Sequence, residues 1–167
     1  MNREEANMKY NKIIGIDPDI DKSGIAIYVR NDKSLILENW TLGELIKNFD
    51  YFHKKRVLFV VEAGYLNKSN WHIKKNSSVV AGEIGRRTGE NHATAKQIVN
   101  IIKEFGFDCV ELPPLAKVWN KGKISHKEFI NKCKKEGVVI GIGRTNQENR
   151  DAGLIALAYD KRLKLNV

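Results

Sequence analysis

The chain has 167 residues, a length that favours one compact domain and argues against a two-domain enzyme. Its 29 Lys and Arg against 20 Asp and Glu give a net charge of +9, which makes nucleic acid the first partner to consider. Hydrophobic residues make up 42% and charged residues 29%, a balance typical of a folded soluble domain and not of a disordered basic tail.

The sequence shows no sign of a membrane or export segment. The longest apolar stretches, Val57–Val61 and Leu154–Tyr159, fall far short of the roughly 20 residues that a membrane-spanning helix needs. Residues 1–11 form a polar leader without the apolar core of a secretory signal, so we expect a cytoplasmic protein. Cys109 and Cys133 lack the spacing of a zinc site, and we expect reduced thiols in the core.

Three strand-like segments open the folded part of the chain. Lys12–Asp17 is a short apolar run that ends in an acid, Gly24–Arg30 alternates between apolar and polar residues, and Ser34–Asn39 follows a short polar connection. Because turn-forming residues separate these segments, the pattern predicts an antiparallel meander.

A helix and a buried strand come next. Thr41 and Glu44 have the spacing of a capping box and predict a helix of about three turns. Its apolar residues recur at helical spacing: Leu42, Leu45, Ile46, Phe49 and Phe52. The continuous apolar run Arg56–Val61 then predicts a strand covered on both faces, and Glu62 ends it.

The second half of the chain alternates helices with one strand. Helical segments are predicted near Ser77–Arg87 and Ala93–Phe105, with an interruption around Thr88–Asn91, and Asp108–Leu112 is a short strand. The last helix is expected from about Gln147 to Lys164.

Between that strand and the last helix, Ser125 and Glu128 form a second capping box, which opens a helix that Gly137 closes. The order of elements predicts an α/β fold in which residues 12–167 form a single domain. We expect a mixed sheet, an antiparallel meander followed by parallel strands, with helices on both faces.

Four acids are candidate metal ligands. Asp17 and Glu62 end core strands, and α/β sheets bind ligands near the carboxyl ends of their strands. Glu148 and Asp151 are three residues apart at the start of the last helix, so they project from one face. Crowded acids repel one another unless hard divalent cations neutralise them, and two magnesium ions about 4 Å apart are suited to phosphodiester hydrolysis. The pattern predicts a two-metal nuclease site.

Each acid also has a structural interpretation. Asp17 precedes a proline, a pair that often starts a turn, and Glu62 suits a salt bridge to a lysine. Glu148 has the position of the glutamate in a capping box with Thr145, and Asp151 suits an ion pair on the helix surface.

Three motifs occur in a familiar order: G-I-D-P with S-G-I-A at residues 15–26, V-V-E-A-G-Y at 60–65, and E-N-R-D-A-G-L-I-A at 148–156. Together they resemble the RuvC-type Holliday-junction resolvases of the RNase H-like superfamily over about residues 12–160. The resemblance implies a five-stranded mixed sheet, a homodimer, and symmetric cleavage of four-way DNA junctions with Mg²⁺ or Mn²⁺. It also implies that the catalytic, metal-binding acids are Asp17, Glu62, Glu148 and Asp151.

Further positions point to nucleic acid. Tyr65, three residues after Glu62, matches a family aromatic that stacks on junction bases, and packing against the next helix is the alternative. Lys117 and Lys127 resemble two family lysines near the active centre. The loop after Glu62 mixes cations with an aromatic, a composition that suits DNA contact or simple solvation: Lys68, Trp71, Lys74 and Lys75.

The chain departs from the family pattern after Pro18, where Asp19 replaces the usual glycine and Asp21 follows. The interruption at Thr88–Asn91 falls in the helical region that commonly forms the family's dimer interface. Two alternatives to a junction resolvase stay open: another RNase H-like nuclease acting on flaps, branched DNA or RNA/DNA hybrids, or a member of the fold that binds nucleic acid without cutting it. An actin-type ATPase is disfavoured because it needs two such domains.

Overall fold

The computed structural model describes residues 9–67, 78–115, 123–141 and 143–164. In chain order the elements are β1 (Lys12–Asp17), β2 (Ser23–Val29), β3 (Ser34–Trp40), α2 (Leu42–Asn48), η1 (Phe49–Tyr51), β4 (Val57–Glu62), η2 (Gly64–Leu66), α3 (Ser78–Glu104), β5 (Asp108–Leu112), α4 (His126–Lys135), β6 (Val139–Ile140) and α5 (Gln147–Lys164). The predicted α/β class is confirmed, and the order of elements agrees except that α3 is one helix and that β6 precedes the last helix.

Within the described residues, six strands form one mixed sheet in the order β5-β4-β1-β2-β3-β6. β1, β2 and β3 form the predicted antiparallel meander, and β4 and β5 continue the sheet in parallel from β1. The expected count of five strands is one too low. The additional strand, β6, has two residues and pairs in parallel with Ser34 and Leu35 of β3, so it is too short to show a period in the sequence.

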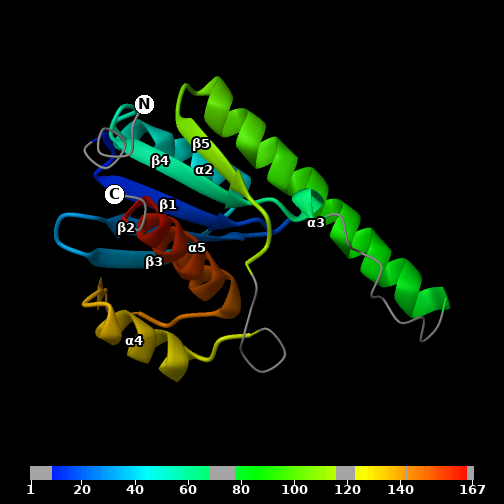
Figure 1. The fold of residues 1–167 in the computed structure, drawn as a ribbon. Helices are drawn as coiled ribbons and strands as arrows, with labels where there is room; N and C mark the ends of the chain where they lie inside the picture. Colours follow the sequence, from blue (N-terminus) through cyan, green and yellow to red (C-terminus); the bar gives the residue numbers. More distant parts are fainter. Residues whose placement is uncertain (1–8, 68–77, 116–122, 142, 165–167) are drawn as a thin grey trace.

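Helices cover both faces of the sheet, as predicted (Figure 1). One core contains Ile13 of β1 with Phe129 of α4 and Ile155 of α5. The opposite core contains Ile14, the next residue of β1, with side chains of α2 and α3 such as Leu45 and Ile102. Alternation of successive strand residues between the two faces explains why the central strands read as continuous apolar runs.

The helix boundaries follow the capping chemistry. In both predicted capping boxes the serine or threonine hydroxyl accepts from the backbone N–H of the glutamate, and the glutamate carboxylate accepts from the cap N–H, at Thr41 with Glu44 and Ser125 with Glu128. Gly137 follows α4 with a φ of 69°, the left-handed conformation that glycine adopts readily at helix ends. α2 is shorter than predicted, and η1 completes the third turn.

α3 is one continuous helix of 27 residues, so the predicted interruption around Thr88–Asn91 is wrong. Gly89 suggested the break because a glycine inside a helix costs roughly 1 kcal/mol relative to alanine. Ion pairs three and four residues apart offset part of that cost: Glu83 pairs with Arg86 and with Arg87 at 2.8 Å each. The C-terminal half of α3 packs on the sheet, and the N-terminal half projects beyond it (Figure 1).

Both cysteines are free thiols, as predicted. Cys133 is buried between α4 and the sheet, and burial raises its pKa to about 11. Burial likewise raises the pKa of the Cys109 thiol, on β5, to about 12. In the part of the chain that the structure describes, no helix combines the length and apolar character needed to cross a membrane.

Candidate functional site

The start of α5 lies directly on the ends of β1 and β2, because both strands carry a glycine there. A Cβ atom on Gly24 would lie 2.1 Å from the carbonyl oxygen of Glu148, and one on Gly15 would lie 2.2 Å from the carbonyl oxygen of Ala152. A side chain at either glycine would force the helix away from the sheet. Since Gly24 pairs with Asp17 across the meander, this contact fixes the first turn of α5 beside the end of β1.

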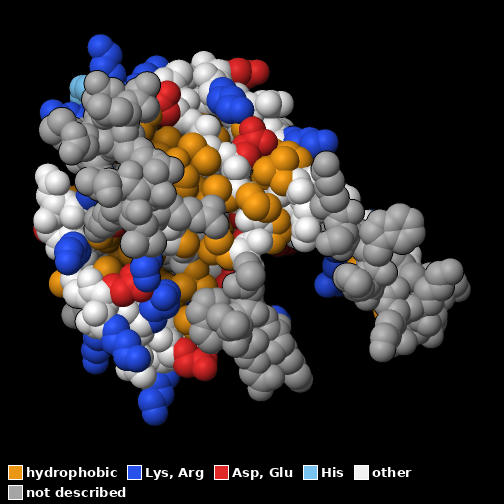
Figure 2. All heavy atoms as spheres, in the orientation of Figure 1, with side chains coloured by type: hydrophobic (Ala, Val, Ile, Leu, Met, Phe, Trp, Pro, Cys, Tyr) orange, Lys and Arg blue, Asp and Glu red, His pale blue; other side chains and the backbone are white. Residues whose placement is uncertain are grey.

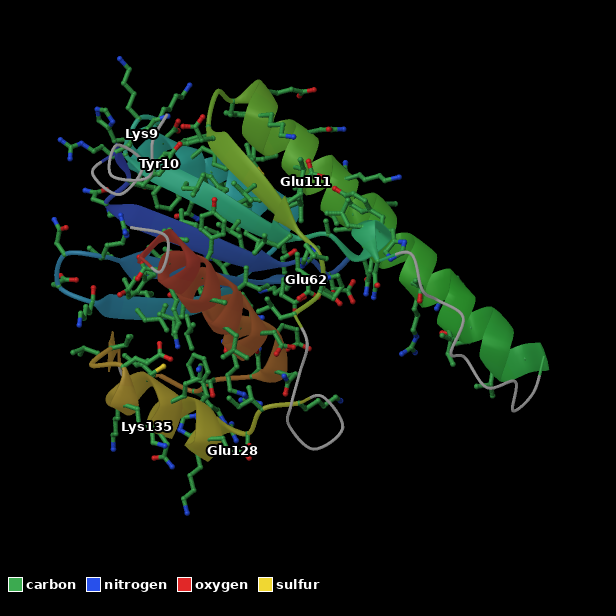
Figure 3. The ribbon with its side chains drawn as sticks, viewed as in Figure 1. Lys9, Tyr10, Glu62, Glu111, Glu128 and Lys135 are labelled. Carbon is green, nitrogen blue, oxygen red and sulfur yellow. The ribbon has the colours of Figure 1, made fainter. Side chains whose placement is uncertain are left out.

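Asp17 and Glu62 come together at the carboxyl edge of the sheet. β1 and β4 are parallel neighbours with Ile16 opposite Val61, so the residues that follow lie side by side. Strand alternation directs both carboxylates to the sheet face that α5 covers. The two acids line one cavity of about 180 Å³. Figure 3 shows Glu62 at the end of the sheet from which α3 projects, opposite the end that carries Lys9 and Tyr10.

Asp151 is buried within the first turns of α5. It is 7% exposed, and its Oδ1 accepts a hydrogen bond from Nε2 of Gln147 at 2.9 Å. Asp151 therefore does not lie on the helix surface, as the alternative interpretation expected. A buried carboxylate costs free energy unless hydrogen bonds or cations compensate it. The burial of Asp151 beside the strand ends therefore keeps it a candidate functional residue.

Glu148 does not cap α5. The cap residue is Asn146, whose side-chain oxygen accepts from the backbone N–H of Asn149 at 2.9 Å, and the Asn149 side chain accepts from the backbone N–H of Asn146 at 3.0 Å. Both amide groups also donate to the Asn39 side-chain oxygen, which ties the start of α5 to β3. The structural interpretation of Glu148 as a capping glutamate is thus wrong, because Asn149 provides the reciprocal bond.

The described structure divides the four predicted acids into two pairs. Asp17 and Glu62 line the cavity, and Glu148 and Asp151 belong to the helix that packs above these strand ends. Among the described residues, no three His, Cys, Asp or Glu side chains form a group that could hold a metal ion. Mg²⁺ commonly binds through one or two carboxylates, with waters and substrate phosphates completing its shell. The oxygen donors of Asp17 and Glu62 fit that requirement.

Three residues of α3 line the same cavity: Thr88, Asn91 and His92. They are not among the predicted site residues, because the sequence pattern suggests a helix break at this point. Their signal was their spacing: Thr88, Asn91 and His92 stand at positions i, i+3 and i+4, which share one face of a continuous helix.

Tyr65 lies in η2 and is held by three neighbours. Its hydroxyl donates to Oε2 of Glu111 on β5, Nζ of Lys96 lies 5.1 Å from its ring centroid, and the His92 ring meets its edge at 6.2 Å between centroids. Burial and the bond to Glu111 raise the pKa of Tyr65. The same hydrogen bond, with one from Lys103, lowers the pKa of Glu111. Figure 3 shows Glu111 on β5 beside α3. The ring is thus packed against the next helix, and its stacking on bases stays a prediction.

Most of the predicted DNA-binding residues fall outside the described residues: Lys68, Trp71, Lys74, Lys75 and Lys117. Lys127 is described, and it lies exposed in the first turn of α4. Other basic side chains gather over this helix (Figure 2), including Lys132, Lys134 and Lys135 in its last turn.

The unusual acids after Pro18 lie beside α3. Asp19 and Asp21 line a neighbouring cavity of about 570 Å³ together with Arg86 and Arg87. Asp19 also shapes the turn, because its Oδ1 accepts from the backbone N–H of Asp21 at 2.9 Å and its own N–H donates to the hydroxyl of Ser23. Their charge therefore lies next to arginines, and Asp19 has a local structural role in place of the family's glycine.

No protein-family model matches this chain, and no curated protein matches it. Its structure is similar to that of Thermus thermophilus RuvC in complex with a Holliday junction substrate, with 15% sequence identity and a TM-score of 0.52 over 92% of this chain and 96% of that chain. It is also similar to T. thermophilus RuvC in a second structure (15% identity, TM-score 0.48, 92% and 96% coverage). The yeast mitochondrial Holliday junction resolvase Ydc2 is another neighbour (14% identity, TM-score 0.40, 94% and 83% coverage). The first similarity shows that the chain has the RuvC-like RNase H fold.

Proposed function

We propose that this chain is a metal-dependent endonuclease that hydrolyses DNA phosphodiesters in branched substrates, four-way junctions above all. The observation that carries the proposal is the placement of Asp17 and Glu62 side by side at the ends of parallel strands, lining one cavity. The RuvC-like fold and the net charge of +9 support the same function. Of the neighbouring structures, the first contains RuvC bound to a Holliday junction, which supports the choice of substrate.

Each acid has a role in this proposal. Asp17 and Glu62 would hold a divalent cation, Mg²⁺ or Mn²⁺, at the carboxyl edge of the sheet, and Asp151 and Glu148 would contribute oxygens from α5 toward a second ion. Bound cations of this kind activate a water molecule and stabilise the leaving oxygen of a phosphodiester. The contacts at Gly15 and Gly24 set the start of α5 directly against β1 and β2, and this close packing supports a role for both pairs.

Replacing Asp17 by asparagine tests the proposal. We expect Asp17→Asn to lose at least about 100-fold in the rate of junction cleavage with Mg²⁺, because it removes a ligand charge from the ion, while DNA affinity is retained. Cleavage of a labelled four-way junction on a denaturing gel gives the rate, and a gel-shift assay in EDTA gives the affinity.

Asp19→Asn is the matched control. It makes the same chemical change two residues away, at an acid that lines the neighbouring cavity, and its amide oxygen can still accept from the N–H of Asp21. We expect near wild-type cleavage from this variant. Equal cleavage by wild type and Asp17→Asn would contradict the enzymatic proposal and favour a protein of this fold that only binds nucleic acid.

Competition between substrates tests the specificity. Four-way junction, three-way junction, flap and RNA/DNA hybrid are offered together at equal concentration, and the proposal expects the four-way junction to be cut first. Preferential cleavage of the flap or of the hybrid would retain the nuclease chemistry and reject the junction as substrate.

A further inference from the structure

One stripe along α3 changes from apolar to polar where the helix leaves the sheet. In the C-terminal half the stripe is buried, and all of it except Ala95 belongs to the core that α3 shares with β1 and β4: Ala95, Ile98, Val99 and Ile102. Continued toward the N-terminus at the same spacing, it becomes Thr88, Asn91 and His92. The polar part of the stripe does not simply face solvent. It lines the cavity together with Asp17 and Glu62.

The contacts of His92 fix one wall of that cavity. Its ring packs edge-on against Tyr65, which is itself bonded to Glu111. A Cβ atom on Gly64 would lie 2.9 Å from Nε2 of His92, so the glycine after Ala63 leaves room for the imidazole. The half-buried ring thus has a defined position in the cavity that Glu62 also lines, beside Gly64 and Tyr65.

Two arginines of α3 near the polar part of the stripe have acidic partners. Arg86 pairs with Glu83 and Glu90, and Arg87 pairs with Glu83. The three side chains of the stripe that line the cavity with the two acids are hydrogen-bonding groups: a hydroxyl, an amide and an imidazole. Such groups can donate to phosphate oxygens and fix the register of a DNA strand.

We propose that Thr88, Asn91 and His92 form a DNA-strand contact that holds the phosphodiester against Asp17 and Glu62. This inference rests on the proposed nuclease function and deepens it, since it names the side chains that position the substrate opposite the acids. A phosphate brought to two carboxylates is repelled by them, and donors on the opposite wall of the cavity supply the compensating hydrogen bonds.

The test compares asparagines on opposite faces of one helix. Asn91→Ala removes a cavity residue, and Asn100→Ala makes the same change at an exposed position nine residues, or about two and a half turns, further along α3. Fluorescence anisotropy with a labelled four-way junction in EDTA measures affinity without cleavage. We expect the dissociation constant to rise about 3- to 10-fold for Asn91→Ala and His92→Ala, the range that loss of one hydrogen bond gives, and to stay unchanged for Asn100→Ala.

Two more variants separate substrate contact from helix structure. His92→Gln keeps a donor and should recover part of the affinity that His92→Ala loses. Gly64→Ala displaces the imidazole without altering α3 and should weaken binding as His92→Ala does. Thermal unfolding followed by circular dichroism shows that each variant is folded before its affinity is compared.

The outcomes distinguish this inference from the function on which it rests. Affinities of Asn91→Ala and His92→Ala equal to that of Asn100→Ala would overturn the contact, even if Asp17→Asn abolishes cleavage. Conversely, weaker junction binding by the two cavity variants, with a wild-type protein that cuts no DNA, would retain the contact and reject the nuclease.

Discussion

Gly24 determines how closely the two pairs of acids approach each other. It stands opposite Asp17 in the β1–β2 pair, and the backbone of Glu148 occupies the space that its side chain would need. Asp17 and Glu62 are placed by strand register, but Glu148 and Asp151 are placed by this helix-to-sheet contact. The distance between the two pairs therefore depends on a residue that carries no functional group of its own.

We expect Gly24→Ala to reduce both stability and cleavage. Its Cβ would lie 2.1 Å from a backbone oxygen, which cannot rotate away, so the start of α5 must shift. Overpacking of this kind costs about 1 to 3 kcal/mol. Urea unfolding gives the loss of stability, and the junction assay gives the loss of rate.

Gly43→Ala is the control for this substitution. Gly43 lies in the first turn of α2, where the nearest atom to an added Cβ is the Thr41 hydroxyl oxygen at 3.9 Å. Alanine favours helix over glycine by up to about 1 kcal/mol, so this variant should be as stable as wild type or more so. A Gly24→Ala protein with wild-type stability and wild-type cleavage would show that α5 does not need this close contact.

Among the elements, α5 is held to the sheet at its far end by a buried ion pair. Nε of Arg30, directly after β2, lies 2.7 Å from Oδ1 of Asp160, and the two side chains are 9% and 5% exposed. The guanidinium also donates to the backbone carbonyl of Tyr10. The pair joins residues 130 positions apart, which sequence periodicity cannot reveal.

Removing one member of this pair should be costly. Asp160→Asn leaves the buried guanidinium without its charge partner, and such losses cost about 3 to 5 kcal/mol. Glu136→Gln is the comparison, because its pair with Lys132 on α4 is more exposed and typically contributes 1 kcal/mol or less. Denaturant midpoints measure both changes. Equal losses for the two variants would mean that burial does not strengthen the contribution of the α5 pair.

α3 shows where sequence patterns mislead. Gly89 and the polar residues beside it suggested a break around Thr88–Asn91, because local propensity disfavours a helix there. α3 is one helix because its C-terminal half packs on the sheet, and the N-terminal turns need only propagate from that packed half. Ion pairs of Glu83 with Arg86 and Arg87 on the helix surface stabilise these turns. Because a break was expected there, Thr88, Asn91 and His92 were not predicted to share one face of α3.

The projecting half of α3 exposes apolar side chains. Val79 is 80% exposed, Val80 50% and Ile84 40%, and Val80 and Ile84, four residues apart, share one face of the helix. We infer that this half of the helix takes part in the homodimer that the family resemblance implies. Symmetric cleavage of a four-way junction needs two active sites. α3, which lines the cavity beside the acids, would then also bring the two sites together.

We expect Ile84→Glu to shift the protein from dimer to monomer, because a charge in an apolar interface is desolvated without a partner. Sedimentation velocity measures the change. Gln97→Glu adds a charge at an exposed position on the half of α3 that lies against the sheet, and it should leave the dimer intact. A wild-type protein that sediments as a monomer at all concentrations, or a dimer unaffected by Ile84→Glu, would rule out this interface.

At the scale of the whole molecule, most of the topology was predictable because short local patterns in the sequence indicate it. Apolar runs that end in Asp17 and Glu62, turn residues between the first strands, and two capping boxes fix the order of elements. Contacts between distant segments could not be predicted, such as Tyr65 with Glu111 or Asn39 with Asn149. The local sequence around each of these residues does not indicate its partner.

The net charge of +9 predicts that DNA affinity falls steeply as salt rises. Each phosphate neutralised by a lysine or arginine releases counterions, and six such contacts lower affinity roughly 10³-fold between 50 and 200 mM salt. Anisotropy titrations of a four-way junction in EDTA at several salt concentrations give the slope. Lys127→Ala, at the exposed start of α4, should reduce the magnitude of that slope by about one. A slope near zero for the wild-type protein would show that its basic residues do not contact the DNA backbone, and the charge argument for a nucleic-acid partner would fail.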